Sequence, residues 1–166
     1  MQPSDFRINI PSESIAQTPL KDRSSSRLMH LEHDAINDLT FSDLPQMLRK
    51  NDLLILNNTK VLPARLLGKK ESGGKVEIFF ERLLTDLSFL AQLKFSGKIH
   101  LGTEIVINEE VFLKIEAREN QFFTISTETS VMKMLNSNGL TPLPPYIKRI
   151  PNKDDRRRYQ TECAKR

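Results

Sequence analysis

Apolar and polar positions alternate with a short period through the middle of the chain. Between residues 61 and 138, six segments from ARLLGKK to QFFTISTE follow one another at a spacing of about ten residues. Breaks rich in Gly, Asn and Glu, such as ESGG and ARENQ, separate these segments. Short strands at such regular spacing are typical of an antiparallel barrel or sandwich. We predict an all-β domain of about six strands, followed by a helix over SVMKMLNSNG with a glycine stop.

The first 60 residues have a different pattern. DLLILNN (residues 52–58) contains a continuous apolar run bounded by polar residues, which favours a strand covered on both faces, as in an α/β sheet. A half-buried strand over Asp5–Ile10, a hairpin around DAIN and a helix capped by Ser42 are also predicted. These elements are too few to bury the apolar run. Its partner strands would come from beyond residue 166, from another chain, or not at all.

The predicted fold is therefore α/β in the broad sense of mixed α+β. An incomplete α/β domain begins over residues 1–60 and is interrupted by an inserted antiparallel β-barrel-like domain over residues 61–138. Residues 139–166 return to the α/β domain. Their proline-rich start, LTPLPPYIKRIP, excludes a regular element, and a helix is expected to begin at Asp154 or Asp155.

The positive charge is concentrated at the end of the chain. Residues 1–138 carry 17 Lys and Arg against 18 Asp and Glu, whereas residues 139–166 carry 8 against 3. Clustered cations are the usual source of sequence-independent affinity for nucleic acids. A solvated basic tail is the alternative interpretation.

Composition excludes several classes of protein. Cys163 is the only cysteine, so a disulfide framework within the chain is excluded and a reducing cytoplasm is expected. No apolar run approaches the roughly 18 residues of a membrane span, and the first residues do not form a secretory signal. His30 and His33 are three apart in a predicted strand, so they point to opposite faces and we expect no metal site.

Two short stretches carry candidate binding residues. Asn57 and Asn58 end the predicted apolar strand, where α/β sheets bind ligands, although Asx-turn capping explains them equally well. Tyr146 is able to stack on a base while Lys148 and Arg149 contact phosphates. The alternative for this second stretch is a rigid connector between domains.

Two further basic stretches have plainer explanations. Gly73 and Gly74 in GKKESGGKVE lack the spacing of a phosphate-binding loop, and a hairpin turn is favoured. Phosphate contacts from that turn by Lys69, Lys70 and Lys75 are the alternative. DDRRRYQTE repeats the combination of cations and an aromatic ring, and a charged helix surface is favoured there.

Four blocks of the sequence together resemble a known family. SDFRINIPSESIAQTPLKDRSSSRL, DLLILNNTKVLPARLLGKKESGGKVEIFFERLL, GLTPLPPYIKR and DDRRRYQTECAKR are similar, in order, to motifs of the S-adenosylmethionine:tRNA ribosyltransferase-isomerases of queuosine biosynthesis. The resemblance implies transfer and isomerisation of the ribosyl group of S-adenosylmethionine onto 7-aminomethyl-7-deazaguanine in tRNA, which gives epoxyqueuosine. It also implies that S-adenosylmethionine is a substrate, and that the tRNA anticodon loop is the partner.

With this resemblance, substrate or tRNA binding is expected where the inserted domain leaves and rejoins the rest of the chain. No residue is assigned as the catalytic base. The expected binding residues are Asn57, Asn58, Thr59, Arg65, Tyr146, Lys148 and Arg149, with Arg23 and Arg27.

This sequence differs from the family in length: it has 166 residues, and proteins of the family are about twice as long. The resemblance therefore implies the N-terminal portion of such an enzyme: a fragment, a split-gene half with a separately encoded C-terminal partner, or a decayed copy. The other interpretations are a non-catalytic RNA-binding β module and a folded remnant without function.

Overall fold

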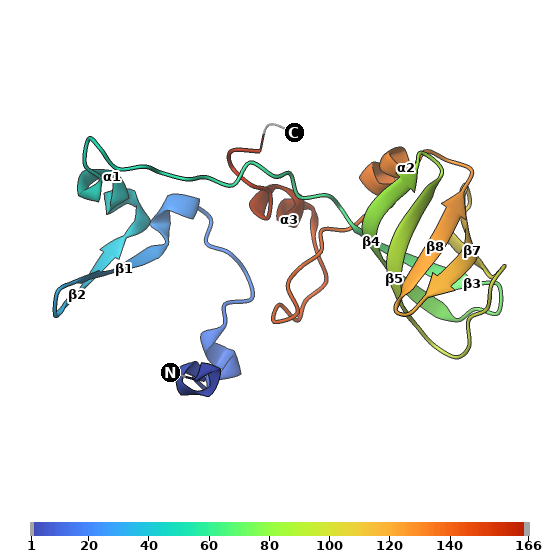
Figure 1. The fold of residues 1–166 in the computed structure, drawn as a ribbon, viewed down its shortest axis with the longest axis horizontal. Helices are drawn as coiled ribbons and strands as arrows, with labels where there is room; N and C mark the ends of the chain where they lie inside the picture. The colour runs from blue at the N-terminus through green and yellow to red at the C-terminus, as the bar shows by residue number, and fades with distance from the viewer. Residues whose placement is uncertain (1, 165–166) are drawn as a thin grey trace. The chain divides into compact units, whose positions relative to one another are not determined.

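Six antiparallel strands close into a barrel in the middle of the chain (Figure 1). The structure is a computed structural model, and it describes residues 2–164. Around the barrel the strands follow the order β3-β4-β5-β8-β7-β6. The predicted mixed α+β fold with about six antiparallel strands is confirmed. The strands are β3 (Arg65–Lys70), β4 (Lys75–Thr85), β5 (Ser88–Phe95), β6 (Glu104–Asn108), β7 (Val111–Glu119) and β8 (Phe122–Thr127).

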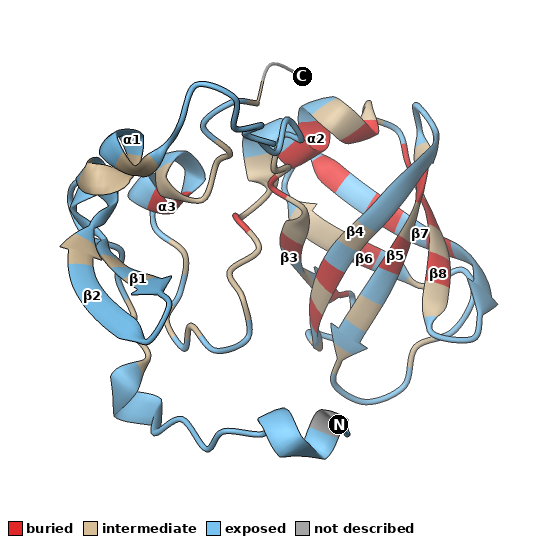
Figure 2. Cartoon of the chain, turned by 60° about the vertical axis from the view of Figure 1, so that its left-hand side comes forward, coloured by how far each residue is buried: buried red, intermediate tan, exposed pale blue. Residues whose placement is uncertain are grey.

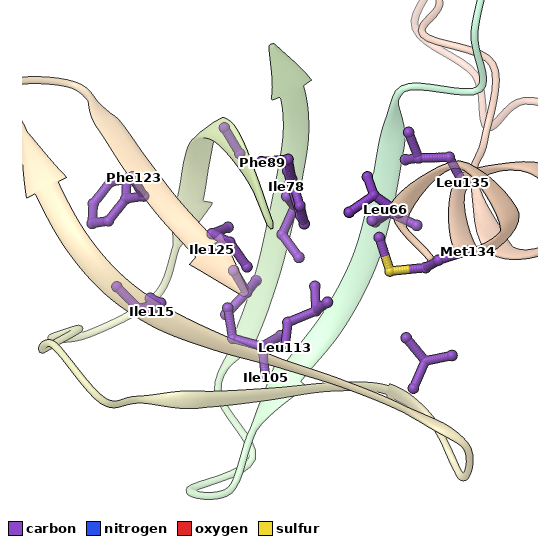
Figure 3. Close-up of a cluster of buried hydrophobic side chains, with 14 residues drawn as sticks. Leu66, Ile78, Phe89, Ile105, Leu113, Ile115, Phe123, Ile125, Met134 and Leu135 are labelled. Carbon is purple, nitrogen blue, oxygen red and sulfur yellow. The ribbon is translucent and has the colours of Figure 1, made fainter. Parts of the chain in front are cut away.

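Alternate side chains of these strands fill the barrel. In β8, Phe123, Ile125 and Thr127 are buried while the residues between them are not, because successive side chains of a strand point to opposite faces. Figure 2 shows the buried residues concentrated on the barrel strands and α2 (Val131–Asn138). Figure 3 shows the resulting core, whose largest members are Phe89, Leu66, Ile78, Ile105, Leu113, Ile115 and Ile125.

The barrel closes where β3 meets β6. Only two residue pairs make this contact, Lys69 with Val106 and Lys70 with Ile105. Gly68 precedes them, and a Cβ at this position would lie 2.6 Å from Cγ2 of Ile105. Since real Cβ atoms do not approach other atoms so closely, the lack of a side chain lets the two strands come together.

The turn between β3 and β4 is the predicted hairpin turn, and Gly73 takes a left-handed φ of 80° there. The Lys70 side chain is buried beside it. Its Nζ donates hydrogen bonds to the carbonyl oxygens of Ser96 (2.7 Å) and Lys98 (2.8 Å). Lys70 therefore holds the loop after β5 against the hairpin, and the alternative of a phosphate contact by this residue is wrong.

Helix α2 covers one end of the barrel, and its prediction is confirmed. Met134 and Leu135 are buried on the side that Figure 3 shows facing Leu66. The helix stops at Gly139, but with φ −75° rather than a left-handed conformation. A Cβ at Gly139 would lie 2.0 Å from the carbonyl oxygen of Pro63, so close backbone approach is the reason for glycine here.

The chain divides into two compact units. Unit 1 is Met1–Asn57 with Pro144–Arg149, and unit 2 is Asn58–Leu143 with Ile150–Arg166. Unit 2 contains the barrel, α2 and α3. Outside the barrel and α2, the elements are η1 (Pro3–Phe6), η2 (Ser12–Ser14), η3 (Arg23–Ser25), β1 (Arg27–Glu32), β2 (Ala35–Thr40), η4 (Phe41–Asp43), α1 (Leu44–Met47) and α3 (Lys153–Arg158).

The secondary structure of unit 1 differs from the prediction in several places. The strand expected over Asp5–Ile10 is wrong, because the chain there contains η1 and then irregular backbone. The hairpin is present, but its turn is formed by His33 and Asp34 rather than by DAIN. Thr40, not Ser42, begins the following helical segment, where the side chain of Asp43 accepts hydrogen bonds from the Thr40 backbone N and Oγ1.

The apolar run at residues 52–58 is not a strand. Within residues 2–164 no strand pairs with it, and Leu53, Leu54, Ile55 and Leu56 are 85%, 57%, 84% and 58% exposed. Both faces of the run are therefore uncovered. The expectation of a buried strand is wrong for the described chain, because the strands that would cover it are not there.

Helix α3 begins one residue earlier than the first predicted position. Asn152 caps it: its Oδ1 accepts a hydrogen bond from the Asp155 backbone N, and Asp155 accepts one from the Asn152 backbone N. Lys165 and Arg166, part of the predicted basic tail, lie outside the described residues. No helix in residues 2–164 has the length and apolar character needed to cross a membrane.

Replacing Phe89 tests the barrel core. Phe89 is fully buried, with its ring centroid 5.7 Å from that of Phe80. Phe89→Ala is expected to lower the free energy of unfolding by about 3–5 kcal/mol, because it leaves a cavity. Phe112, a half-exposed phenylalanine of β7, provides the matched control: Phe112→Ala should change stability much less. Urea unfolding followed by circular dichroism measures both, and equal losses would contradict the described core.

Replacing Lys70 tests its structural role. Lys70→Met retains most of the side-chain volume but removes the ammonium group. The carbonyl oxygens of Ser96 and Lys98 then lose the hydrogen bonds that they accept from it. A loss of about 1–3 kcal/mol in unfolding free energy is expected. The exposed neighbour provides the control, since Lys69→Met removes the same charge from the same strand. A Lys70→Met protein as stable as the Lys69→Met protein would refute this role.

Candidate functional site

Gln17 holds the stretch that contains Tyr146, Lys148 and Arg149. Its Nε2 donates to the carbonyl oxygen of Tyr146 (3.1 Å), and its Oε1 accepts from the backbone N of Lys148 (2.7 Å). The backbone oxygen of Gln17 accepts a hydrogen bond from Nε of Arg149 (2.8 Å). All four residues belong to unit 1, so two segments distant in sequence form one local structure.

These contacts fix the backbone at Tyr146 and Lys148 and leave those two side chains exposed, whereas the side chain of Arg149 is itself bonded to Gln17. The Tyr146 side chain is 55% exposed, and Lys148 is exposed as well. An exposed ring next to a cation is a suitable surface for a nucleobase and its phosphate. Sequence reasoning did not select Gln17, since it is neither charged nor aromatic; its only signal was its position inside the first block of the family resemblance.

Arg23 and Arg27 lie near each other in the chain but have different surroundings. Arg27 forms an ion pair with Asp38 across the β1–β2 hairpin, and both side chains are largely exposed. The hydrogen bond from Arg27 lowers the pKa of the Asp38 carboxyl, and the same bond raises the pKa of Arg27. Arg23 begins η3, and its carbonyl oxygen accepts a hydrogen bond from Oγ of Ser26.

Asn57, Asn58 and Thr59, which follow Leu56, are exposed and lie outside any helix or strand. Asn57 belongs to unit 1, whereas Asn58 and Thr59 belong to unit 2. Their predicted position beyond the carboxyl end of a buried strand is not observed, because residues 52–58 form no strand.

Arg65 is largely buried and paired. Its Nε contacts Oε1 of Glu77 on the neighbouring strand, and the two side chains are 26% and 19% exposed. Its backbone pairs with that of Leu140, with N–O distances of 3.3 Å and 2.7 Å. Arg65 thus joins the entrance of the barrel to its exit.

A cleft rich in cations, which we call the basic cleft, lies in unit 2. It has a volume of about 760 Å³ and is bordered by residues 60–63, α2 and α3. Four of its lining residues are cationic and none is acidic. Its polar lining residues are Lys60, Asn136, Lys153, Arg156, Arg157 and Gln160.

Side-chain amides hold the walls of the basic cleft together. Gln160 pairs with the backbone of Val61, accepting from its N (2.9 Å) and donating to its O (3.1 Å). Arg156 donates to the carbonyl oxygen (3.0 Å) and to Oδ1 (3.3 Å) of Asn136 in α2. Asp155 is 1% exposed, and its carboxylate accepts a hydrogen bond from the backbone N of Asn152 in the cap of α3. The cleft therefore has fixed walls and an excess of positive charge.

In residues 2–164 no group of three or more His, Cys, Asp or Glu side chains could hold a metal ion. Cys163 is exposed. The cations of the basic cleft and the exposed Tyr146 are the chemically distinctive groups.

Comparison with known proteins identifies the family. The family model described as "Queuosine biosynthesis protein" matches residues 3–166. An S-adenosylmethionine:tRNA ribosyltransferase-isomerase of Coxiella burnetii (strain Dugway 5J108-111) is 44% identical over 98% of this chain. Proteins of the same name from Vesicomyosocius okutanii and Stenotrophomonas maltophilia are 44% and 43% identical over 100% and 99% of it. The family resemblance noted from the sequence is confirmed.

The chain spans about half the length of these relatives, 49% in each case. A crystal structure of an S-adenosylmethionine tRNA ribosyltransferase from Thermotoga maritima is 28% identical, with a TM-score of 0.41. That match covers 81% of this chain and 48% of the other. By the match of residues 3–166 and the identity to these relatives, the chain belongs to the queuosine biosynthesis protein family.

Proposed function

We propose that this chain takes part in transferring and isomerising the ribosyl group of S-adenosylmethionine onto 7-aminomethyl-7-deazaguanine in tRNA. The amine of the modified base accepts the ribosyl group, adenine and methionine are released, and epoxyqueuosine is formed. The observation that supports this proposal is 44% identity, over 98% of the chain, to a protein named for the reaction. A cytoplasmic location and independence from metal ions are part of the proposal.

A second polypeptide segment is required by the proposal, because the chain spans only about half of its relatives. Leu53 and Ile55 are more than four-fifths exposed, and the surrounding run has apolar side chains on both faces. On the β1–β2 hairpin, Met29, Leu31 and Ile36 add a further exposed apolar surface. Exposed apolar surface of this kind is typical of an interface. The proposed occupant is the polypeptide corresponding to the remaining half of the relatives.

Binding of tRNA is the role assigned to the Gln17–Arg149 structure. Tyr146 stacks on a base of the anticodon loop, while Lys148 and Arg149 contact the adjacent phosphates. Gln17 keeps their backbone in place through its hydrogen bonds to Tyr146 and Lys148. The other residues proposed for substrate or tRNA binding are Asn57, Asn58, Thr59, Arg65, Arg23 and Arg27.

The chemical step needs a proton to be removed beside the sulfonium of S-adenosylmethionine. The positive sulfur acidifies the neighbouring C–H, so a modest, well-positioned base is sufficient. The residues of this chain are assigned to binding and orientation, and the base is not assigned to any of them.

An RNA-binding β module without catalytic activity is the second candidate function. The closed barrel favours it, because this fold is complete within the described chain and does not depend on another polypeptide. The two candidates differ in one measurable property: only the first leads to transfer of ribose.

Reconstitution tests the proposed reaction. The chain is co-expressed with the remaining half of the Coxiella burnetii relative, and label is followed from ribose-labelled S-adenosylmethionine into precursor-bearing tRNA. Transfer is expected only when both polypeptides are present. Leu53→Asp combined with Ile55→Asp should abolish it, because charges in that run prevent burial.

Arg118→Ala with Lys133→Ala, two changes at exposed positions of unit 2, serves as the control and should leave transfer intact. Full turnover by the chain alone would refute the need for a second polypeptide. Absence of transfer from the pair, despite a stable complex, would refute the proposed reaction.

Replacement of Tyr146 tests the assigned stacking. Tyr146→Ala should weaken binding of an anticodon stem–loop RNA by roughly 1–3 kcal/mol, the usual contribution of one stacked base. Tyr146→Phe keeps the ring and should bind almost as well as the unchanged chain. Fluorescence anisotropy with labelled RNA measures both affinities. If the alanine variant binds like the phenylalanine variant, Tyr146 does not stack on the RNA.

A further inference from the structure

A second hollow of unit 2 shares lining residues with the basic cleft. This hollow of about 480 Å³ is lined by residues 139–141 and by the segment that leads into α3. Lys153 and Arg156 line both volumes, so the two hollows adjoin at these cations. The second hollow, like the first, has no acidic lining residue.

The position of Arg156 is fixed by the structure. Its two guanidinium nitrogens Nη1 and Nη2 bond to the carbonyl oxygen and the side chain of Asn136, which anchors the side chain between the hollows. Lys60 and Arg157 add charge to the larger hollow. The cations come from the segment before β3 and from α3, which the fold brings to one cleft although the whole barrel separates them in sequence.

Two adjoining hollows that share cations have the size and charge to bind several linked phosphates rather than one small anion. A single phosphate would occupy only a small part of either volume. Neither lining contains an aromatic side chain, so the site offers charge for a backbone without a platform for bases. Val61, Leu62 and Met132 provide apolar surface against which sugars are able to lie.

We infer that the basic cleft and the adjoining hollow bind consecutive phosphates of an RNA backbone, independently of base sequence. The inference rests on the proposed function in one respect, which is that the natural ligand is a tRNA. The contact is separate from the stacking assigned to Tyr146, which belongs to unit 1. It supplies affinity and positioning, whereas recognition of the modified base takes place elsewhere.

The salt dependence of RNA binding tests the inference. The variant combines Lys60→Ala, Lys153→Ala and Arg157→Ala, and it keeps Arg156 with its bonds to Asn136. Each lost phosphate contact should reduce the slope of log affinity against log salt by about 0.7–0.9, which gives a total of about two or more. Affinity for a synthetic anticodon stem–loop RNA at low salt should fall roughly tenfold or more.

The matched control removes the same charge elsewhere on unit 2. Arg82, Lys114 and Lys133 are exposed and line none of the hollows described, and replacing all three by alanine should change the slope much less. Circular dichroism melting checks that both triple variants fold. If the cleft variant does not fold, Lys60→Gln and Lys153→Gln as single variants take its place, with an expected slope change of about one each.

Three outcomes would overturn the inference. They are an unchanged salt slope in the folded cleft variant, an equal loss in the control variant, and complete displacement of the RNA by inorganic phosphate at a single site. Ribosyl transfer is measured separately in the reconstituted pair. A cleft variant with reduced RNA affinity would support the inference even where that assay shows no transfer, so failure of the proposed reaction is distinguishable from failure of the cleft.

Discussion

The candidate surfaces of unit 2 depend on the pairing between the entrance and the exit of the barrel. The backbones of Arg65 and Leu140 bond to each other in both directions, at 3.3 Å and 2.7 Å. Gly139 makes this approach possible, because a side chain there would overlap the Pro63 carbonyl. The pairing sets residues 60–63 beside the end of α2, and Gln160 then binds the backbone of Val61. The basic cleft exists because two ends of one domain meet.

The barrel could be predicted from the sequence because its signal is local. Each strand has its own alternation, and the burial pattern of β8 follows that alternation residue by residue. The apolar run at 52–58 has an equally clear pattern, but a strand also requires a neighbour, and no strand of residues 2–164 lies beside it. The prediction that Gly139 stops the helix is confirmed. Its reason, a close contact with Pro63, involves a residue far away in the sequence and was not predictable.

The residues of the candidate site could be predicted only where side chains of suitable chemistry stand close together in the sequence. Tyr146 and Lys148 were selected because an aromatic residue and a cation stand close together in the chain, and the structure leaves both exposed. Gln17 was missed, since a side-chain amide that binds backbone has no distinguishing pattern. The basic cleft was also missed as a unit, because Lys60 and Lys153 are separated by the whole barrel. Lys70 shows why the hairpin interpretation was the better one: a lysine beside a turn donates to carbonyl oxygens of its own chain.

The paired ends of the barrel also affect how this domain is able to vary. Arg65 and Leu140 pair directly with each other, so the pairing at the two ends of the barrel does not involve the turns between the strands. The turn at Asn120, between β7 and β8, takes no part in that pairing. Insertions and deletions there would leave the separation of the two ends unchanged. We therefore expect the domain to tolerate changes of length at such turns, but not at the paired residues Arg65 and Leu140.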